Sequence, residues 1–278
     1  MKLLRYGPVG HEKPACLDAS GTMRDLSGVV ADFEGEGVSL EALDALKRLD
    51  LEALPVVDGA PRIGAALARV ETFYAIGLNY AQHAAEAGME PPKEPILFNK
   101  SASCLAGPND ALTLPKGSEK SDWEVELGVV IGRRAQNVSV DDALSYVAGY
   151  CVINDLSERA YQIERGGQWT KGKSAPGFGP VGPYLVTADE VPDPQALGLR
   201  LSLNGEMVQD NFTSDMIFSV AEIIAHMSEF MALVPGDVIA TGTPEGVGMG
   251  MKPQRFLRSG DVMELEIDGL GKQRTEVL

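Results

Sequence analysis

Two carboxylates lie two residues apart in the segment Trp123–Ile131, whose apolar residues alternate as they do in a β-strand. Because alternate side chains of a strand share a face, we expect Glu124 and Glu126 to lie side by side, where they could hold one cation. An amphipathic strand with both glutamates in water is the other interpretation.

Asp155 follows the apolar segment Tyr150–Asn154 and precedes a stretch that we expect to be helical. With Glu124 and Glu126 it forms a set of three carboxylates. Oxygen-only ligands are typical of Mg²⁺ or Mn²⁺, with Ca²⁺ as an alternative occupant in a crystal, and not of zinc. The residues Asp155–Glu158 also match a helix capping box, which would give Asp155 a purely structural role.

His83 and Glu86 are three residues apart in the segment Tyr80–Gly88, which has a helical pattern that ends on glycine. This spacing allows the carboxylate to orient the imidazole for proton transfer. A surface helix that carries one histidine and one glutamate fits the pattern equally well. The chain has only two other histidines, His11 and His226.

The glycine-rich segment Thr241–Gly248 follows an apolar segment, so its backbone N–H groups and a hydroxyl could approach an anionic ligand. It contains neither the Gly-Lys-Ser/Thr of a phosphate-binding loop nor Gly-x-Gly-x-x-Gly before a helix, and a plain turn cluster is the alternative. Lys171 and Lys173 are either solvent charges or cations that face a carboxylate substrate.

Short apolar segments separated by Gly, Pro and Asp must position these residues, and they predict a mainly β protein. Asn204-Gly205 predicts a type I′ hairpin, and Asp268-Gly269 predicts a second turn. We expect a small N-terminal domain over residues 1–68 and a catalytic domain over residues 69–278. The predicted strands are Ile96–Asn99, Glu124–Ile131, Tyr146–Asn154, Gly182–Val186, Leu199–Leu203, Asp237–Thr241 and Met263–Ile267, and the main predicted helices are Ser39–Leu51 and Ser219–Leu233.

The composition narrows the classes of partner. The 278 residues carry a net charge of −16, which argues against nucleic acid or an anionic membrane as a partner. The chain shows neither an apolar run of membrane-spanning length nor the apolar core of a signal peptide, so we expect a cytoplasmic protein. Cys16, Cys104 and Cys151 are odd in number and far apart, which is typical of reduced thiols.

Taken in chain order, these motifs closely resemble the fumarylacetoacetate hydrolase family over roughly residues 70 to 278. Each motif alone is weakly specific, but the ordered set is highly specific. The set consists of Ile76–Tyr80 with His83 and Glu86, Phe98–Lys100, Trp123–Leu127, Gly149-Tyr150 leading to Asp155, Lys173-Ser174 before Gly179–Pro183, and Pro235–Ile239 leading to Thr241–Gly248.

The resemblance implies an α+β, mainly β fold: a mixed β-sandwich roll with short helices, a small N-terminal appendage and a tendency to form homodimers. It implies a divalent metal at Glu124, Glu126 and Asp155, and a dyad of His83 and Glu86 on a mobile lid helix. The remaining site residues that it implies are Lys173 in the catalytic site and Lys100, Arg159, Gln162, Lys171 and Thr243 as substrate contacts.

Arg5–Pro8 and Arg165–Lys173 look most like family members that hydrolyse 2,4-diketo-3-deoxy sugar acids of the fuconate and rhamnonate type. We therefore expect metal-dependent cleavage of a carbon–carbon bond in a small anionic 2,4-diketo acid, with release of pyruvate and a second acid. The polar stretch around Gln168 suits a hydroxylated tail. Acylpyruvate hydrolase, oxaloacetate decarboxylase and hydroxymuconate-type isomerase activities remain alternatives, as does a non-catalytic cation or ligand sensor.

Overall fold

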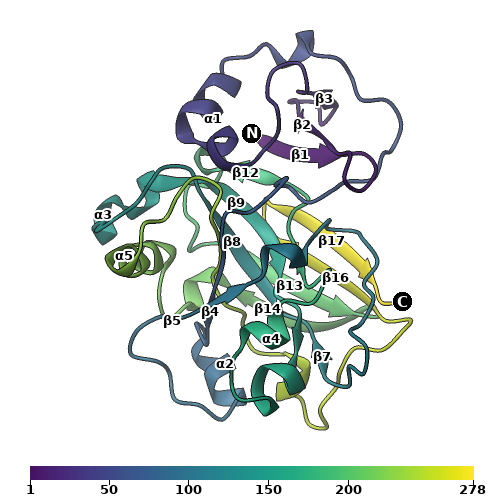
Figure 1. The fold of residues 1–278 in the computed structure, drawn as a ribbon, viewed down its shortest axis with the longest axis vertical. Coiled ribbons are helices and arrows are strands. Elements are labelled where there is room, and N and C mark those ends of the chain that lie inside the picture. Colours follow the sequence, from purple (N-terminus) through teal and green to yellow (C-terminus); the bar gives the residue numbers. More distant parts are fainter.

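The computed structural model describes residues 1–278, and a nine-stranded mixed sheet forms its centre (Figure 1). Strands β15 and β4 run parallel, and the other neighbours in this sheet run antiparallel. In spatial order the strands are β3 (Met23–Asp25), β2 (Lys13–Leu17), β1 (Lys2–Tyr6), β12 (Leu185–Thr187), β9 (Val147–Asn154), β8 (Val125–Ile131), β15 (Val238–Ala240), β4 (Phe73–Gly77) and β5 (Ile96–Lys100).

A second, four-stranded antiparallel sheet packs against β8 and β9. Alternate residues of its central strands, such as Leu201 and Leu265, are buried in the core between the two sheets. The predicted turn at Asn204-Gly205 is confirmed, because both residues have the positive φ values, 55° and 81°, that a type I′ turn requires. In spatial order the strands are β14 (Glu206–Phe212), β13 (Gly198–Leu203), β16 (Val262–Ile267) and β17 (Gly271–Glu276).

The helices are short and lie around the sheets. Helix α5 begins after Ser219, whose side chain forms a capping box with Glu222, as its sequence predicts. Helix α1 begins after Ser39 but ends well before the predicted Leu51, because Asp50 caps a separate turn. The helices are α1 (Leu40–Leu46), α2 (Ala81–Glu86), α3 (Val140–Ala143), α4 (Thr170–Lys173) and α5 (Val220–Phe230). No helix is long and apolar enough to span a membrane.

The helix expected directly after Asp155 does not form there. Ser157–Glu158 is a short strand, β10, that pairs with β7 (Ser121–Asp122). The helical backbone begins later, in a π-helical turn at Ala160–Glu164. The capping interpretation of Asp155 is therefore wrong, and pairing with a segment distant in the chain overrides the local pattern. Strands β6 (Leu105–Ala106) and β11 (Gly179–Pro180) form the other small pair.

The N-terminal segment extends the main sheet. Strand β1 pairs with β12, with Leu3 opposite Leu185, and Leu3, Cys16 and Leu26 belong to the same buried core as the central strands. Figure 1 shows this segment as a cap at one end of the molecule, with α2 and α4 at the other end. The mainly β fold with mixed sheets is thus confirmed, and the boundary at residue 68 stays a prediction.

Candidate active site

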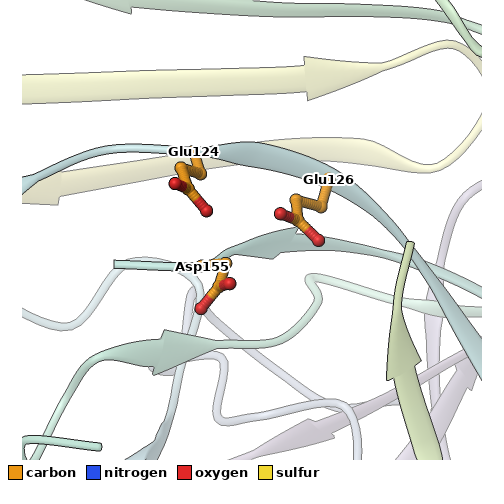
Figure 2. A group of neighbouring side chains, drawn as sticks. All are labelled: Glu124, Glu126 and Asp155. Atoms are coloured by element: carbon orange, nitrogen blue, oxygen red, sulfur yellow. The ribbon is translucent and has the colours of Figure 1, made fainter. Parts of the chain in front are cut away.

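Glu124, Glu126 and Asp155 form a buried carboxylate cluster where β8 and β9 meet (Figure 2). Val125 pairs with Asn154, so the start of β8 lies beside the end of β9. Glu124 and Glu126 are 4% and 1% exposed, because β8 is an inner strand covered on both faces. The interpretation of β8 as a surface strand is therefore wrong. One oxygen from each of the three carboxylates lies within 4.8 Å of the others.

Two of the three carboxylates are held by buried cations. Lys173 Nζ lies 2.6 Å from Glu124 Oε2 and 2.7 Å from Asp155 Oδ2. Arg159 Nη2 lies 2.7 Å from Glu124 Oε1. Burial alone would raise the pKa of Glu124, but the charges of Lys173 and Arg159 hold it well below its usual range. Glu124 is therefore ionised at neutral pH.

Glu126 has no cationic partner. Its carboxylate accepts one hydrogen bond, from the backbone N–H of Gly242 at 2.8 Å. Burial, together with the negative charges of Asp155 and Glu124, raises its pKa well above the usual value. A divalent cation fits this donor set, because all three residues offer only oxygen and a cation would stabilise the ionised form of Glu126.

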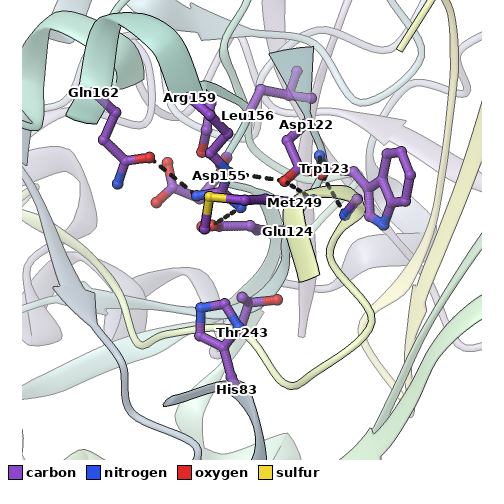
Figure 3. A network of polar contacts seen from close by, with 12 residues as sticks. His83, Asp122, Trp123, Glu124, Asp155, Leu156, Arg159, Gln162, Thr243 and Met249 are labelled. Atoms are coloured by element: carbon purple, nitrogen blue, oxygen red, sulfur yellow. Dashed lines mark hydrogen bonds and ion pairs between the residues drawn. The ribbon is translucent and has the colours of Figure 1, made fainter. Parts of the chain in front are cut away.

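His83 and Glu86 form a hydrogen-bonded pair on α2. His83 Nδ1 lies 2.8 Å from Glu86 Oε1, which leaves Nε2 for the cavity. His83 is buried and Glu86 is half-buried, so the interpretation of a surface helix is wrong. Figure 3 shows His83 and Thr243 set apart from Glu124, Arg159 and Gln162 across an open space.

The segment Gly242–Met249 is attached to the site through its backbone. The N–H of Gly246 donates to Glu86 Oε2 at 3.0 Å, and that of Gly242 donates to Glu126. The N–H groups of Gly248 and Met249 both donate to Asp122, at 2.7 and 3.0 Å. The loop thus offers its N–H groups to carboxylate side chains of the protein and not, as its sequence had suggested, to an anionic ligand.

Asp122 and Gln209 belong to the site and were missed by the sequence reasoning. Asp122 is fully buried, and it also accepts from Arg159 Nε at 2.8 Å, so it orients that guanidinium. Its position just before the Trp-Glu-x-Glu motif was the available signal. Gln209 Nε2 donates to Thr243 Oγ1 at 2.8 Å from the other sheet. No local signal marks Gln209.

The residues around the cluster enclose a cavity of about 260 Å³. Of the residues predicted for the site, the structure brings seven to its wall. The hydroxyl group of Thr243 donates a hydrogen bond to the carbonyl oxygen of Val125 at 2.9 Å. Gln162 Oε1 accepts a hydrogen bond from Arg159 Nη1 at 3.1 Å. The seven residues are His83, Glu124, Glu126, Arg159, Gln162, Lys173 and Thr243.

Lys100 and Lys171 do not reach the cavity wall. Lys100 Nζ lies beneath the cluster, 2.5 Å from both Asp155 Oδ1 and the carbonyl oxygen of Lys173. Lys171 is exposed, and its Nζ donates to the carbonyl oxygen of Arg165 at 2.8 Å. Lys100 therefore positions Asp155, while Lys171 stabilises the end of the π-helical turn.

The three cysteines lie outside the cavity wall as buried free thiols, as predicted. Burial raises the pKa of Cys151 to about 12 and that of Cys16 to about 11. Both thiols are therefore protonated at neutral pH and are unsuited to nucleophilic catalysis.

Comparisons with known proteins identify the family of this chain. Residues 72–278 match the family described as Fumarylacetoacetate (FAA) hydrolase C-terminal. A Burkholderia cenocepacia protein named as a proposed hydrolase is 59% identical over 274 residues, which cover 98% of this chain and 97% of the relative.

Two solved structures illustrate the range of activities. Fumarylacetoacetate hydrolase from Exiguobacterium antarcticum is 34% identical with a TM-score of 0.88, and the match covers 100% of this chain and 99% of that one. A 2-hydroxyhepta-2,4-diene-1,7-dioate isomerase from Mycobacterium marinum is 31% identical with a TM-score of 0.75, covering 100% and 98%. The chain belongs to the fumarylacetoacetate hydrolase family, whose members among these neighbours include hydrolases and isomerases.

Proposed function

We propose that this protein is a divalent-metal-dependent hydrolase that cleaves the bond between C3 and C4 of a 2,4-diketo acid. One observation carries the proposal: an imidazole, oriented by Glu86, faces the carboxylate cluster across the cavity. A proton acceptor on one side and a cation site on the other are the two parts that water attack on a diketo acid requires.

Glu124, Glu126 and Asp155 would hold the metal, Mg²⁺ or Mn²⁺. When bound, such an ion supplies Lewis acidity toward the 1-carboxylate and the 2-keto oxygen of the substrate. Arg159 and Lys173 add positive charge to the cavity wall, and the pKa of Lys173 is raised by Asp155 and Glu124 despite its burial. With such an ion bound, the charges around the cavity would favour an anion although the whole chain is acidic.

His83 Nε2 takes a proton from a water molecule, and the resulting hydroxide adds to C4. The C3–C4 bond then breaks, and its electron pair moves to C3 and the 2-keto oxygen. A proton returned to C3 gives pyruvate, and C4 leaves as the carboxyl carbon of the second acid. Glu86 stabilises the charged imidazolium, and Gln162 and Lys173 lie where they can face the oxyanion at C4.

Pyruvate release from a panel of 2,4-diketo acids, with added Mg²⁺ or Mn²⁺, tests this function. We expect one pyruvate and one second acid for each molecule consumed. Loss of CO₂ from oxaloacetate without cleavage of any diketo acid would make the protein a decarboxylase, and a shifted double bond without cleavage would make it an isomerase.

The narrower form of the proposal, a 2,4-diketo-3-deoxy sugar acid as substrate, is supported by the resemblance of Arg5–Pro8 and Arg165–Lys173. The cavity itself does not add support to it. Gln168, around which the polar stretch expected to suit a hydroxylated tail is centred, is exposed and does not line the cavity. The class of substrate tail therefore has to be argued from the cavity wall.

A further inference from the structure

The cavity has two chemically different ends. All its charged residues are buried and gather around the carboxylate cluster. Its mouth carries Met89 and Ile163, which are 48% and 50% exposed, with Met249 half-buried beside them. Large apolar side chains that are half exposed around one opening are a common sign of a binding site for an apolar group.

The polar side chains next to Trp169 in the sequence form hydrogen bonds outside the cavity. Gln168 Oε1 accepts from the backbone N–H of Thr170 at 3.4 Å. Thr170 Oγ1 donates to the carbonyl oxygen of Asn99 at 2.8 Å, and Lys171 Nζ donates to Arg165. None of the three lines the cavity. Hydroxyl groups on a tail that reaches Met89 and Ile163 would therefore lie against apolar side chains there and not against these polar groups.

One wall of the mouth depends on a glycine. Trp169 packs across Gly77 at the end of β4, so closely that a Cβ on Gly77 would lie 2.3 Å from Trp169 Cζ3. The indole also meets the ring of Phe98 edge to face, with centroids 5.2 Å apart. Both aromatic residues line the cavity together with Ile76 and Leu78. The apolar wall is thus built by close packing that starts in the main sheet.

We propose that the substrate is an acylpyruvate with an apolar tail, and that Met89, Ile163 and Trp169 select this tail. This inference rests on the proposed function for the diketo-acid head. The head lies among the buried charges, and the tail extends past Trp169 toward Met89 and Ile163. Apolar area buried on the tail then stabilises the bound substrate, and a hydroxylated tail gains less because it has less apolar area to bury.

A substrate series tests the tail directly. We expect kcat/KM to rise about two- to fourfold for each methylene added from acetylpyruvate through propanoylpyruvate to pentanoylpyruvate. The C5-hydroxylated form of propanoylpyruvate, which is a diketo-deoxy sugar acid, should be a poorer substrate than propanoylpyruvate itself. A higher kcat/KM for the hydroxylated acid, or no change along the series, would overturn the inference.

Two variants locate the effect at the mouth. Met89→Gln and Ile163→Thr should each reduce the preference for pentanoylpyruvate over acetylpyruvate, measured as the ratio of the two kcat/KM values, by about threefold or more. Met207→Gln and Val56→Thr are the matched controls, because these residues are 53% and 50% exposed and lie outside the cavity wall. An equal loss of preference in the controls would contradict a role for the mouth.

Binding separates this inference from the proposed function. Oxamate and N-butyloxamate share a head group that resembles the α-keto acid but cannot be cleaved. Calorimetry with Mn²⁺ present should show tighter binding of N-butyloxamate, and Met89→Gln should reduce that advantage. Tighter binding without pyruvate release from any diketo acid would reject the hydrolase and keep the apolar tail site. Pyruvate release with equal binding of both oxamates would reject the tail site and keep the hydrolase.

Discussion

Two groups of acidic and basic side chains in this protein are built in different ways. The first is the carboxylate cluster with its cations Lys173, Lys100 and Arg159. The second, the N-terminal cluster, joins β1 to the loops beside it and consists of Arg5, Glu12, Asp32, Arg62 and Asp110. Every carboxylate of the N-terminal cluster has an arginine partner, including two-point contacts of Arg5 with Asp32 and of Arg62 with Asp110.

The two clusters differ because one carboxylate of the carboxylate cluster, that of Glu126, has no cationic partner. The N-terminal cluster is partly exposed to water, and its charges satisfy one another. In the carboxylate cluster, Glu126 is fully buried and receives only the N–H of Gly242. Isolated buried charges are unfavourable unless another group compensates them. The charges of the N-terminal cluster are thus balanced within the protein, whereas the unpaired Glu126 supports the proposal that a cation binds the carboxylate cluster.

The largest effect is expected from Glu126→Gln, a nearly isosteric change that removes only the charge. Activity should fall to background, and Mn²⁺ affinity measured by calorimetry should fall by about 100-fold or more, beyond the loss typical of residues that merely support a ligand. The metal-free variant should be at least as stable as the wild type. The matched control is Asp110→Asn, which should reduce stability and keep activity. Unchanged Mn²⁺ affinity in Glu126→Gln would remove Glu126 from the metal site.

The variant His83→Ala separates proton transfer from the binding of the metal ion and the substrate head group. We expect hydrolysis to fall by about 10²- to 10⁴-fold, the range typical of a lost general base. Mn²⁺ and oxalate should still bind, because His83 is not part of the carboxylate cluster. Steady-state rates and calorimetry on the same preparation give both results. Full hydrolytic activity in this variant would refute the assigned base.

The two clusters should respond to pH with opposite signs. The pKa of Glu126 is raised, so in metal-free protein the folded state binds a proton that the unfolded state has lost, and stability falls as pH rises above the usual glutamate range. Burial alone would raise the pKa of Glu12, but hydrogen bonds from Arg62 lower it, so its stabilisation is lost as pH falls through that lowered pKa.

Unfolding in denaturant, measured across pH with a chelator present, gives both the loss of stability at higher pH and the loss in acid. Each of the two glutamates should change the free energy of unfolding by up to about 1.4 kcal/mol per pH unit. Glu126→Gln should reduce only the decline at higher pH, and Glu12→Gln should reduce only the decline in acid. Neither variant removes its decline completely, because other carboxylates, Glu124 among them in acid, also have shifted pKa values. If neither variant changed the pH dependence of the free energy of unfolding, the opposite pH responses assigned to the two clusters would be wrong.

The smallest effect is expected from Arg62→Met, which removes the contacts to Asp110 and Glu12. Because Arg62 is partly exposed, the loss of stability should be only about 1 to 2 kcal/mol. The denaturation midpoint measures this change, and kcat/KM per folded molecule should stay at the wild-type value. A large loss of activity would show that the two clusters are coupled.

Elements with strong local signals could be predicted from the sequence. The alternation in Trp123–Ile131 predicted β8, and Asn204-Gly205 predicted the hairpin of β13 and β14. Ser219 with Glu222 predicted the start of α5. The positions of His83 and Glu86 on one helix also followed from their spacing. In each of these cases the interaction lies within a few residues along the chain.

Features set by distant contacts could not be predicted. Asp122 accepts hydrogen bonds from the backbone N–H groups of Gly248 and Met249, which lie 126 and 127 residues away in the chain. The strand at Ser157–Glu158 forms only because β7 lies beside it, which overrode the capping pattern. The polar composition around Gln168 favoured a substrate with a hydroxylated tail, but the direction in which a loop side chain points depends on tertiary packing and not on composition.

The loop Gly242–Met249 has a consequence for how this enzyme can diversify. Its contacts to Glu126, Glu86 and Asp122 use backbone N–H groups, which every residue except proline provides. Gly246 and Gly248 are fixed, because a Cβ on either would lie 1.8 Å from a carbonyl oxygen. At position 249, by contrast, any residue except proline would keep the N–H that binds Asp122, and the side chain of Met249 lines the cavity. Selection can therefore change the shape of the mouth at this position while the arrangement of the catalytic groups is inherited intact.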